Sequence, residues 1–117
     1  MKYKLFVLMG LFLFSVVTVH SMPSDYADEL KKSDKALTKV YKELMAELKR
    51  QNLEVEVKKL KEAERAWIKY REAQCDFENR YLAAGAQCTL KEIQAREQKL
   101  KELLTYAKQS APANVKR

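Results

Sequence analysis

Two cysteines and one histidine are the side chains of this chain best suited to nucleophilic, redox or metal chemistry. Cys75 and Cys88 are the only cysteines, and His20 is the only histidine, among 117 residues. This small set argues against a conventional zinc site and a histidine-dependent catalytic triad. The cysteines lack the C-x-x-C spacing of redox pairs, and no histidine lies near either of them. A structural disulfide is therefore the favoured interpretation, with a redox or nucleophilic pair as the minor alternative.

Paired carboxylates are the other groups that could act as catalysts, in general acid and base roles. Glu62 with Glu64, and Asp76 with Glu78, lie two residues apart. On a helix, residues at this spacing point in different directions and do not face one substrate. We therefore expect no enzyme, and no catalytic, cofactor-binding or metal-binding residues.

Residues 1–21 have the pattern of a secretory signal peptide. Lys2 and Lys4 give a basic start, residues 5–19 carry no charge, and Ser21 is a small residue at the expected cleavage position. The uncharged stretch is short for a membrane span of about 20 residues, so cleavage is favoured over a retained anchor. The mature chain loses His20, Lys2 and Lys4, which leaves 21 basic and 16 acidic residues and a net charge of +5. It would be secreted or periplasmic, where disulfides persist.

The remaining residues predict three helices and one domain over residues 22–109, followed by a flexible basic tail over residues 110–117. Between Pro23 and Pro112 there is no proline and a single glycine, Gly85, in a stretch rich in good helix formers. Apolar residues at steps of three and four predict helices over about 25–51, 53–82 and 90–108. Three amphipathic helices with short connections predict an all-α fold, an antiparallel three-helix bundle with one disulfide. The expected buried stripes are Leu30, Leu37, Val40, Tyr41, Leu44 and Leu48; Leu53, Val57, Leu60, Ala63, Trp67, Tyr70, Gln74, Phe77 and Tyr81; and Leu90, Ile93, Leu100, Leu103, Leu104 and Ala107.

Local signals predict where these helices begin and end. Ser24 is the expected N-cap of the first helix, and residues 51–52 are the expected bend after it. Residues 83–88 are the expected second turn, with Gly85 free to adopt a positive φ. Residues 89–92 match a capping box that would start the third helix. Such a turn brings Cys75 and Cys88 within reach, and the small loop they close is worth about 3 kcal/mol in the chain-entropy model.

The segment LKEAERAWIKYREAQC, residues 60–75, carries more information than its periodicity. With Cys88 and Arg96, it resembles the lysozyme-inhibitor LprI-like N-terminal domain family of small secreted bacterial helical proteins. The resemblance extends over about residues 30–104. Glu64 stands where glutamine is usual in the family, the loop between the cysteines is shorter, and a further upstream cysteine is missing. The matching motif residues, which we expect to be mainly structural, are Trp67, Ile68, Tyr70, Arg71 and Arg96.

The resemblance implies a protein partner, with a lysozyme as the named one, inhibited by steric occlusion of its cleft. Many lysozymes are cationic, as is this chain, so a complex would need a local acidic contact within about 8 Å. Glu72, Asp76 and Glu78, at the end of the second helix, are the weak candidates for that surface. Core packing is the expected role of Trp67, Tyr70 and Phe77, three aromatic residues of the second predicted stripe. Arg71 is expected to pair with Asp34 or Glu97, and Arg96 with Glu92 or an acid of the second helix.

The charge pattern also bears on other partners. Basic and acidic residues are interleaved along all three helices, which argues against nucleic acid. No membrane span is expected after signal cleavage. The alternative function is a cell-envelope structural or interaction module that binds a different protein or an anionic polymer. Nothing in the pattern predicts an oligomeric state.

Overall fold

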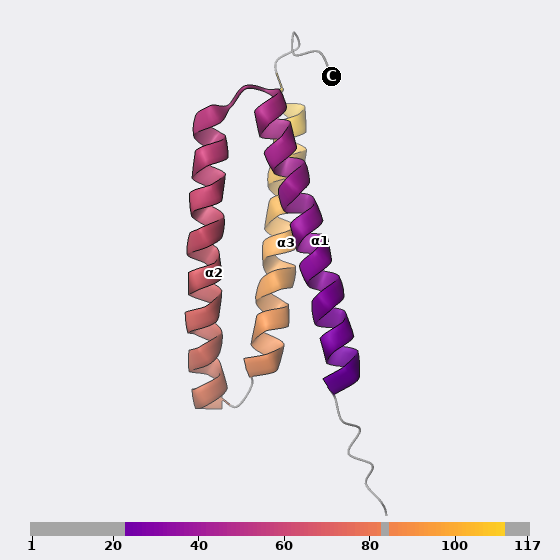
Figure 1. Ribbon diagram of the computed structural model, residues 1–117, viewed down its shortest axis with the longest axis vertical. Helices are drawn as coiled ribbons and strands as arrows, with labels where there is room; N and C mark the ends of the chain where they lie inside the picture. Colours follow the sequence, from indigo (N-terminus) through magenta and orange to yellow (C-terminus); the bar gives the residue numbers. More distant parts are fainter. Residues whose placement is uncertain (1–22, 83–84, 112–117) are drawn as a thin grey trace, which may run out of the picture.

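The computed structural model describes residues 23–82 and 85–111 of the chain. They form three helices: α1 (Pro23–Arg50), α2 (Glu54–Leu82) and α3 (Gly85–Gln109). α1 and α3 run in the same direction, and α2 runs antiparallel to both (Figure 1). The described residues contain no strand, so the prediction of an all-α antiparallel bundle is confirmed. The expected signal peptide and the last six residues of the expected tail lie outside the described residues.

The turn between α1 and α2 follows the prediction and has a defined geometry. Asn52 is in the left-handed region, with a φ of 58°. Its N–H donates to the Lys49 carbonyl at 3.0 Å, and the Leu53 N–H donates to the Leu48 carbonyl at 3.0 Å. These two bonds are the pair that defines a Schellman motif, and asparagine is one of the few residues that adopts its left-handed position readily. The end of α1 is therefore encoded locally, by the asparagine at position 52.

The start of α1 differs by two residues from the prediction. Ser24 was expected as the N-cap, but α1 begins at Pro23 and contains Ser24. Proline is tolerated in the first turn because the N–H that it lacks has no intrahelical partner there.

The start of α3 is a larger correction. Residues 85–88, expected to belong to a turn, form the first residues of α3, so Gly85 has no positive φ and Thr89 is not the N-cap. Ala86 and Gln87 are good helix formers. Cys88 is only 4% exposed, and its bond to Cys75 places this segment against α2. Tertiary packing therefore extends the helix upstream of the local capping signal.

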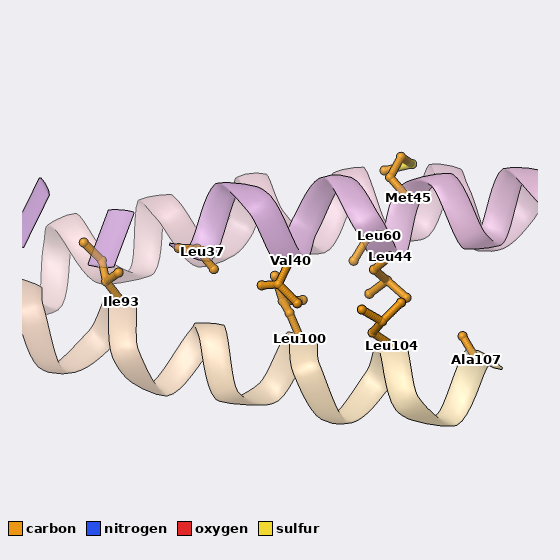
Figure 2. Packing of buried hydrophobic residues seen from close by; sticks show 9 residues of the cluster. All are labelled: Leu37, Val40, Leu44, Met45, Leu60, Ile93, Leu100, Leu104 and Ala107. Atoms are coloured by element: carbon orange, nitrogen blue, oxygen red, sulfur yellow. The ribbon is translucent and has the colours of Figure 1, made fainter. Parts of the chain in front are cut away.

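The core lies mainly between α1 and α3. Figure 2 shows Val40 pointing toward Leu100, and Leu44 toward Leu104. Leu100 is fully buried at 0% exposure. Among the clustered buried residues, α2 contributes only Leu60. The full cluster is Leu37, Val40, Leu44, Met45, Leu60, Ile93, Leu100, Leu104 and Ala107, with Leu30, Tyr41, Leu48, Val57 and Trp67 packed against it.

The expected stripe of α2 is only half correct. Val57, Leu60 and Trp67 face the core, as predicted. Tyr70, Phe77 and Tyr81 do not, because they are 55%, 57% and 76% exposed. A pattern that repeats every seven residues drifts by about 20° per heptad around a straight helix, so one long seam cannot stay against one neighbour. Ala63 and Leu103, also expected in the stripes, are exposed as well.

Candidate functional site

Trp67 is the centre of a cluster of family-motif residues between α2 and α3. It is partly buried and packs against the core. The Arg71 guanidinium lies 5.0 Å from the centroid of its indole ring, and the Arg96 guanidinium lies 5.8 Å from it. Both distances allow a cation–π interaction. The ring therefore holds one arginine of its own helix and one of α3.

The Arg96 guanidinium also forms the ion pair that joins α3 to α2. Its Nη2 lies 2.9 Å, and its Nε 3.0 Å, from the Oε2 of Glu64. The two side chains are only 16% and 14% exposed. Charged hydrogen bonds of this kind are stronger than neutral ones, and partial burial reduces their screening by water. The expected pairing of Arg96 with an acid of the second helix is confirmed.

The expected ion pair of Arg71 was wrong. None of the ion pairs within residues 23–82 and 85–111 includes Arg71, which instead lies over the Trp67 ring. Asp34 is exposed, and Glu97 pairs with Lys101 at 2.6 Å. The indole face lies on the same helix, four residues away, and is therefore the nearer partner.

Tyr41 of α1 is partly buried against the core and is influenced by the charges of this cluster. Burial raises the pKa of its phenol, the negative charge of Glu64 raises it further, and Arg65 opposes the rise. The Glu64 carboxylate therefore binds Arg96 of α3 and acts through its charge on Tyr41 of α1. The motif cations are engaged by an aromatic ring or a carboxylate, an arrangement suited to holding helices together.

The disulfide between Cys75 and Cys88 is present, as predicted. The sulfur atoms are 2.10 Å apart and the Cα atoms 5.5 Å apart. Both residues are buried, at 7% and 4% exposure. Neither thiol is free, so the bridge fixes the last two turns of α2 next to the first turn of α3.

The three acidic residues expected at the binding surface do not form one group. Glu72 and Asp76 lie one turn apart on one exposed face of α2. Asp76 pairs with Arg80 at 3.1 Å. Glu78 is half-buried on another side of the helix, and accepts a hydrogen bond from the Gln74 amide at 2.9 Å. The structure therefore leaves Glu72 as the unpaired exposed carboxylate of this set.

A comparison with protein-family models gives a match over most of the chain. The family model described as lysozyme inhibitor LprI matches residues 16–100, from upstream of α1 to within α3. The chain belongs to the lysozyme inhibitor LprI family. Neither a curated protein nor a solved structure matches the chain.

The LprI family match includes every motif residue assigned from the sequence. Trp67, Arg71 and Arg96 form the cluster described above. Ile68 and Tyr70 do not join it, because they are 37% and 55% exposed. Family-motif residues of this LprI protein therefore divide between a buried contact and an exposed surface.

The exposed aromatic surface is the feature that sequence reasoning missed. The rings of Phe77 and Tyr81 stack on each other, with centroids 5.6 Å apart and planes 9° apart. The available signal was the spacing: Tyr70 and Phe77 continue a three-and-four pattern from Ala63 and Ala66, beside the pattern that includes Leu60 and Trp67. Two such patterns on one helix indicate two apolar faces.

An apolar groove of about 430 Å³ opens beside the α1–α2 turn. The described residues contain no group of three or more histidine, cysteine or acidic residues that could hold a metal ion. None of their helices is long and apolar enough to cross a membrane. The groove is lined by Leu44, Leu48, Gln51, Leu53, Glu56, Leu60, Leu103, Tyr106, Ala107 and Ser110.

Proposed function

We propose that this LprI-family protein is an exported, non-enzymatic binding protein that inhibits a lysozyme by covering its cleft. The family match over residues 16–100 is the observation that supports this proposal. Residues 1–21 would direct export to the periplasm or the exterior and be removed there. The protein would act as a rigid body, because its helices are joined by a disulfide and a partly buried ion pair.

The exposed face with Glu72 and Asp76 is the part of this chain that we propose as the lysozyme contact. The mature chain is cationic, so it has no long-range attraction for a cationic lysozyme. The contact must then come from nearby carboxylates within the screening length of about 8 Å. Glu72 forms no ion pair, and the exposed Asp76–Arg80 pair is worth little, so both carboxylates can turn to a partner at small cost. Glu78 is a weaker contributor, because its carboxylate is already held by Gln74.

An activity assay tests this proposal directly. Mature protein, residues 22–117, is added in micromolar excess to lysozymes of several structural types, and peptidoglycan hydrolysis is followed. We expect inhibition of at least one type, and an apparent Kd about tenfold higher for Glu72→Lys, which corresponds to about 1.4 kcal/mol. Absence of inhibition for every lysozyme type would refute the proposed function.

Glu43→Lys is the matched control for this experiment. Glu43 is also an exposed glutamate in the middle of a helix, with a lysine one turn before it and an acid one turn after it. The substitution changes the net charge by the same amount, but on α1. Inhibition by this variant should stay within twofold of wild type, and an equal loss in both variants would mean that only net charge matters.

A second function is supported by the exposed aromatic residues of α2. Exposed apolar patches mark protein contacts, so Tyr70, Phe77 and Tyr81 favour an envelope interaction module with a partner other than a lysozyme. A pull-down with mature protein from its own periplasm distinguishes the two functions. Recovery of a lysozyme supports inhibition, whereas recovery of another envelope protein that is lost with Phe77→Glu supports the module.

A further inference from the structure

α2 has a second apolar face that no other helix of the described structure covers. It is formed by Ala63, Ala66, Tyr70, Ala73 and Phe77, all exposed, at alternating steps of four and three. We call these five residues the α2 seam. This spacing is the heptad pattern by which helices pair in coiled coils.

The α2 seam is distinct from the surface that α2 turns toward the core. With about 100° between successive residues, Tyr70 lies roughly 80° around the helix from Leu60 and roughly 140° from Cys75. Those two residues are buried against the rest of the bundle, whereas Tyr70 is 55% exposed. None of the three described helices therefore covers the α2 seam.

The order of large and small residues indicates which helix fits. We propose that two copies of the chain pair through the α2 seam, with their α2 helices antiparallel about a two-fold axis between Arg71 and Glu72. In this register Tyr70 lies opposite Ala73 of the second copy, and Phe77 opposite Ala66, so each ring meets a small side chain. A parallel pair would set ring against ring and alanine against alanine, which packs unevenly.

The charges beside the α2 seam agree with the same register. Lys69 and Asp76 are exposed on one flank and lie one position before Tyr70 and Phe77. In the antiparallel pair, Lys69 of each copy comes beside Asp76 of the other, so the two-fold symmetry gives two opposite-charge contacts. Glu72 lies outside the contact, on the side facing water.

The available area suits a weak dimer. Tyr70 and Phe77 of the seam, and Tyr81, which stacks on Phe77 beside the seam, are 55%, 57% and 76% exposed. With about 150–250 Å² per aromatic side chain, the rings and the alanines together would bury roughly 1,000 Å² over both copies. This is the lower end of specific interfaces, so we expect a Kd on the order of 10–100 μM.

Sedimentation equilibrium of mature protein from about 5 to 500 μM tests the pairing. We expect a monomer–dimer equilibrium that Phe77→Glu weakens at least tenfold. Tyr106→Glu is the matched control, because Tyr106 is an aromatic residue of α3, 69% exposed and outside the seam. This variant should dimerise like wild type. A monomer at every concentration, or an unchanged dimer with Phe77→Glu, would overturn the proposal.

A charge exchange tests the register. Lys69→Glu and Asp76→Lys should each weaken the dimer several-fold, and the double variant should restore it. Additive weakening in the double variant would exclude the antiparallel register.

The pairing and lysozyme inhibition can fail separately. Asp76 lies at the edge of both proposed surfaces, but Glu72 belongs only to the lysozyme contact and Phe77 only to the α2 seam. Glu72→Lys should reduce inhibition and leave the dimer intact, whereas Phe77→Glu should do the reverse. A protein that stays monomeric and loses inhibition with Phe77→Glu would mean that the seam contacts the enzyme, and self-pairing would then be wrong.

Discussion

α1 and α2 are held to α3 in different ways. α1 packs on α3 through a continuous apolar seam, in which Val40 and Leu44 meet Leu100 and Leu104 (Figure 2). α2 places only Leu60 in the same cluster. Its other links to α3 are the Cys75–Cys88 bridge, the Glu64–Arg96 ion pair and the contacts of Trp67. One helix is thus held by apolar area and the other by a few local bonds.

This difference explains how a helix of 29 residues can leave aromatic side chains exposed. Attachment through a covalent bond and an ion pair needs little apolar surface. The apolar residues of α2 that do not face α3 are therefore available for another contact, as the α2 seam illustrates. We therefore expect the loss in unfolding free energy to depend on which attachment a substitution removes: the apolar contact, the disulfide or the ion pair.

The largest effect is expected in the apolar contact between α1 and α3. Leu100→Ala should lower the free energy of unfolding by about 4 kcal/mol, because it leaves a cavity where the side chain is 0% exposed. Leu103→Ala, in the same helix at 37% exposure, should cost about 1 kcal/mol or less. Urea unfolding measures both. Equal losses would show that the α1–α3 seam does not dominate stability.

Removal of the disulfide should come next. Replacing Cys75 and Cys88 together by alanine should cost about 3 kcal/mol, because the unfolded chain regains the freedom of a closed loop with a sequence separation of 13 residues. A reductant added to wild type should lower the urea midpoint to the same extent. Hydrogen exchange should increase at the end of α2 and not in α1. Uniform loss of protection would contradict the difference between the two helices.

The ion pair of α2 with α3 should have a smaller effect. A double-mutant cycle with Glu64→Gln and Arg96→Gln should give a coupling of about 1.5 kcal/mol, since both partners are mostly buried. Glu64→Gln should also lower the pKa of Tyr41, because it removes a negative charge that raises it, and ultraviolet titration measures this. A coupling near zero would leave the bridge and Leu60 as the main attachment of α2.

The smallest effect should be a loss of stability at low pH that originates at the α1–α2 turn. Hydrogen bonds from Arg50 and Gln51 lower the pKa of Glu47 from 4.5 to about 2. A carboxyl group whose pKa is lower in the folded state stabilises above its unfolded pKa, so this contribution should decrease as the pH falls from about 4.5 toward 2. Arg50 is 28% exposed, and water screens the pair.

Unfolding curves measured between pH 2 and 6, a range that spans the ordinary carboxyl pKa of about 4, test this contribution. Glu47→Gln and Arg50→Met should each flatten the acid-dependent decline. A decline that persists unchanged in both variants would place its origin in other carboxylates.

Features encoded by neighbouring residues were predictable from the sequence. The absence of proline between Pro23 and Pro112, the apolar stripe of α1 and the bend expected at residues 51–52 predicted two helices and the turn between them. The disulfide was predicted from two cysteines in a chain whose first residues have a signal-peptide pattern. The helices and the turn depend on residues a few positions apart, and the disulfide depends on the presence of only two cysteines, so neither required the position of another helix.

Features that depend on a neighbouring helix were not predictable. Residues 89–92 form a sound local capping signal, yet with Cys88 packed on α2 the helix α3 starts at Gly85, five residues before the predicted Leu90. Arg71 had acidic residues within plausible reach, but Trp67 lies closer. Tyr70 and Phe77 share the spacing of a buried seam, and only the position of α3 decides which side of α2 is covered.

The position of the sulfur bridge has a consequence for proteolytic damage. Arg80 is an exposed trypsin site between Cys75 and Cys88, with a side chain that is 79% exposed. Cleavage after it would yield two polypeptides that remain covalently joined, with α1 and most of α2 on one piece and α3 on the other. Such a nicked protein would keep the same mass in a non-reducing gel apart from one added water, and would separate into fragments only after reduction.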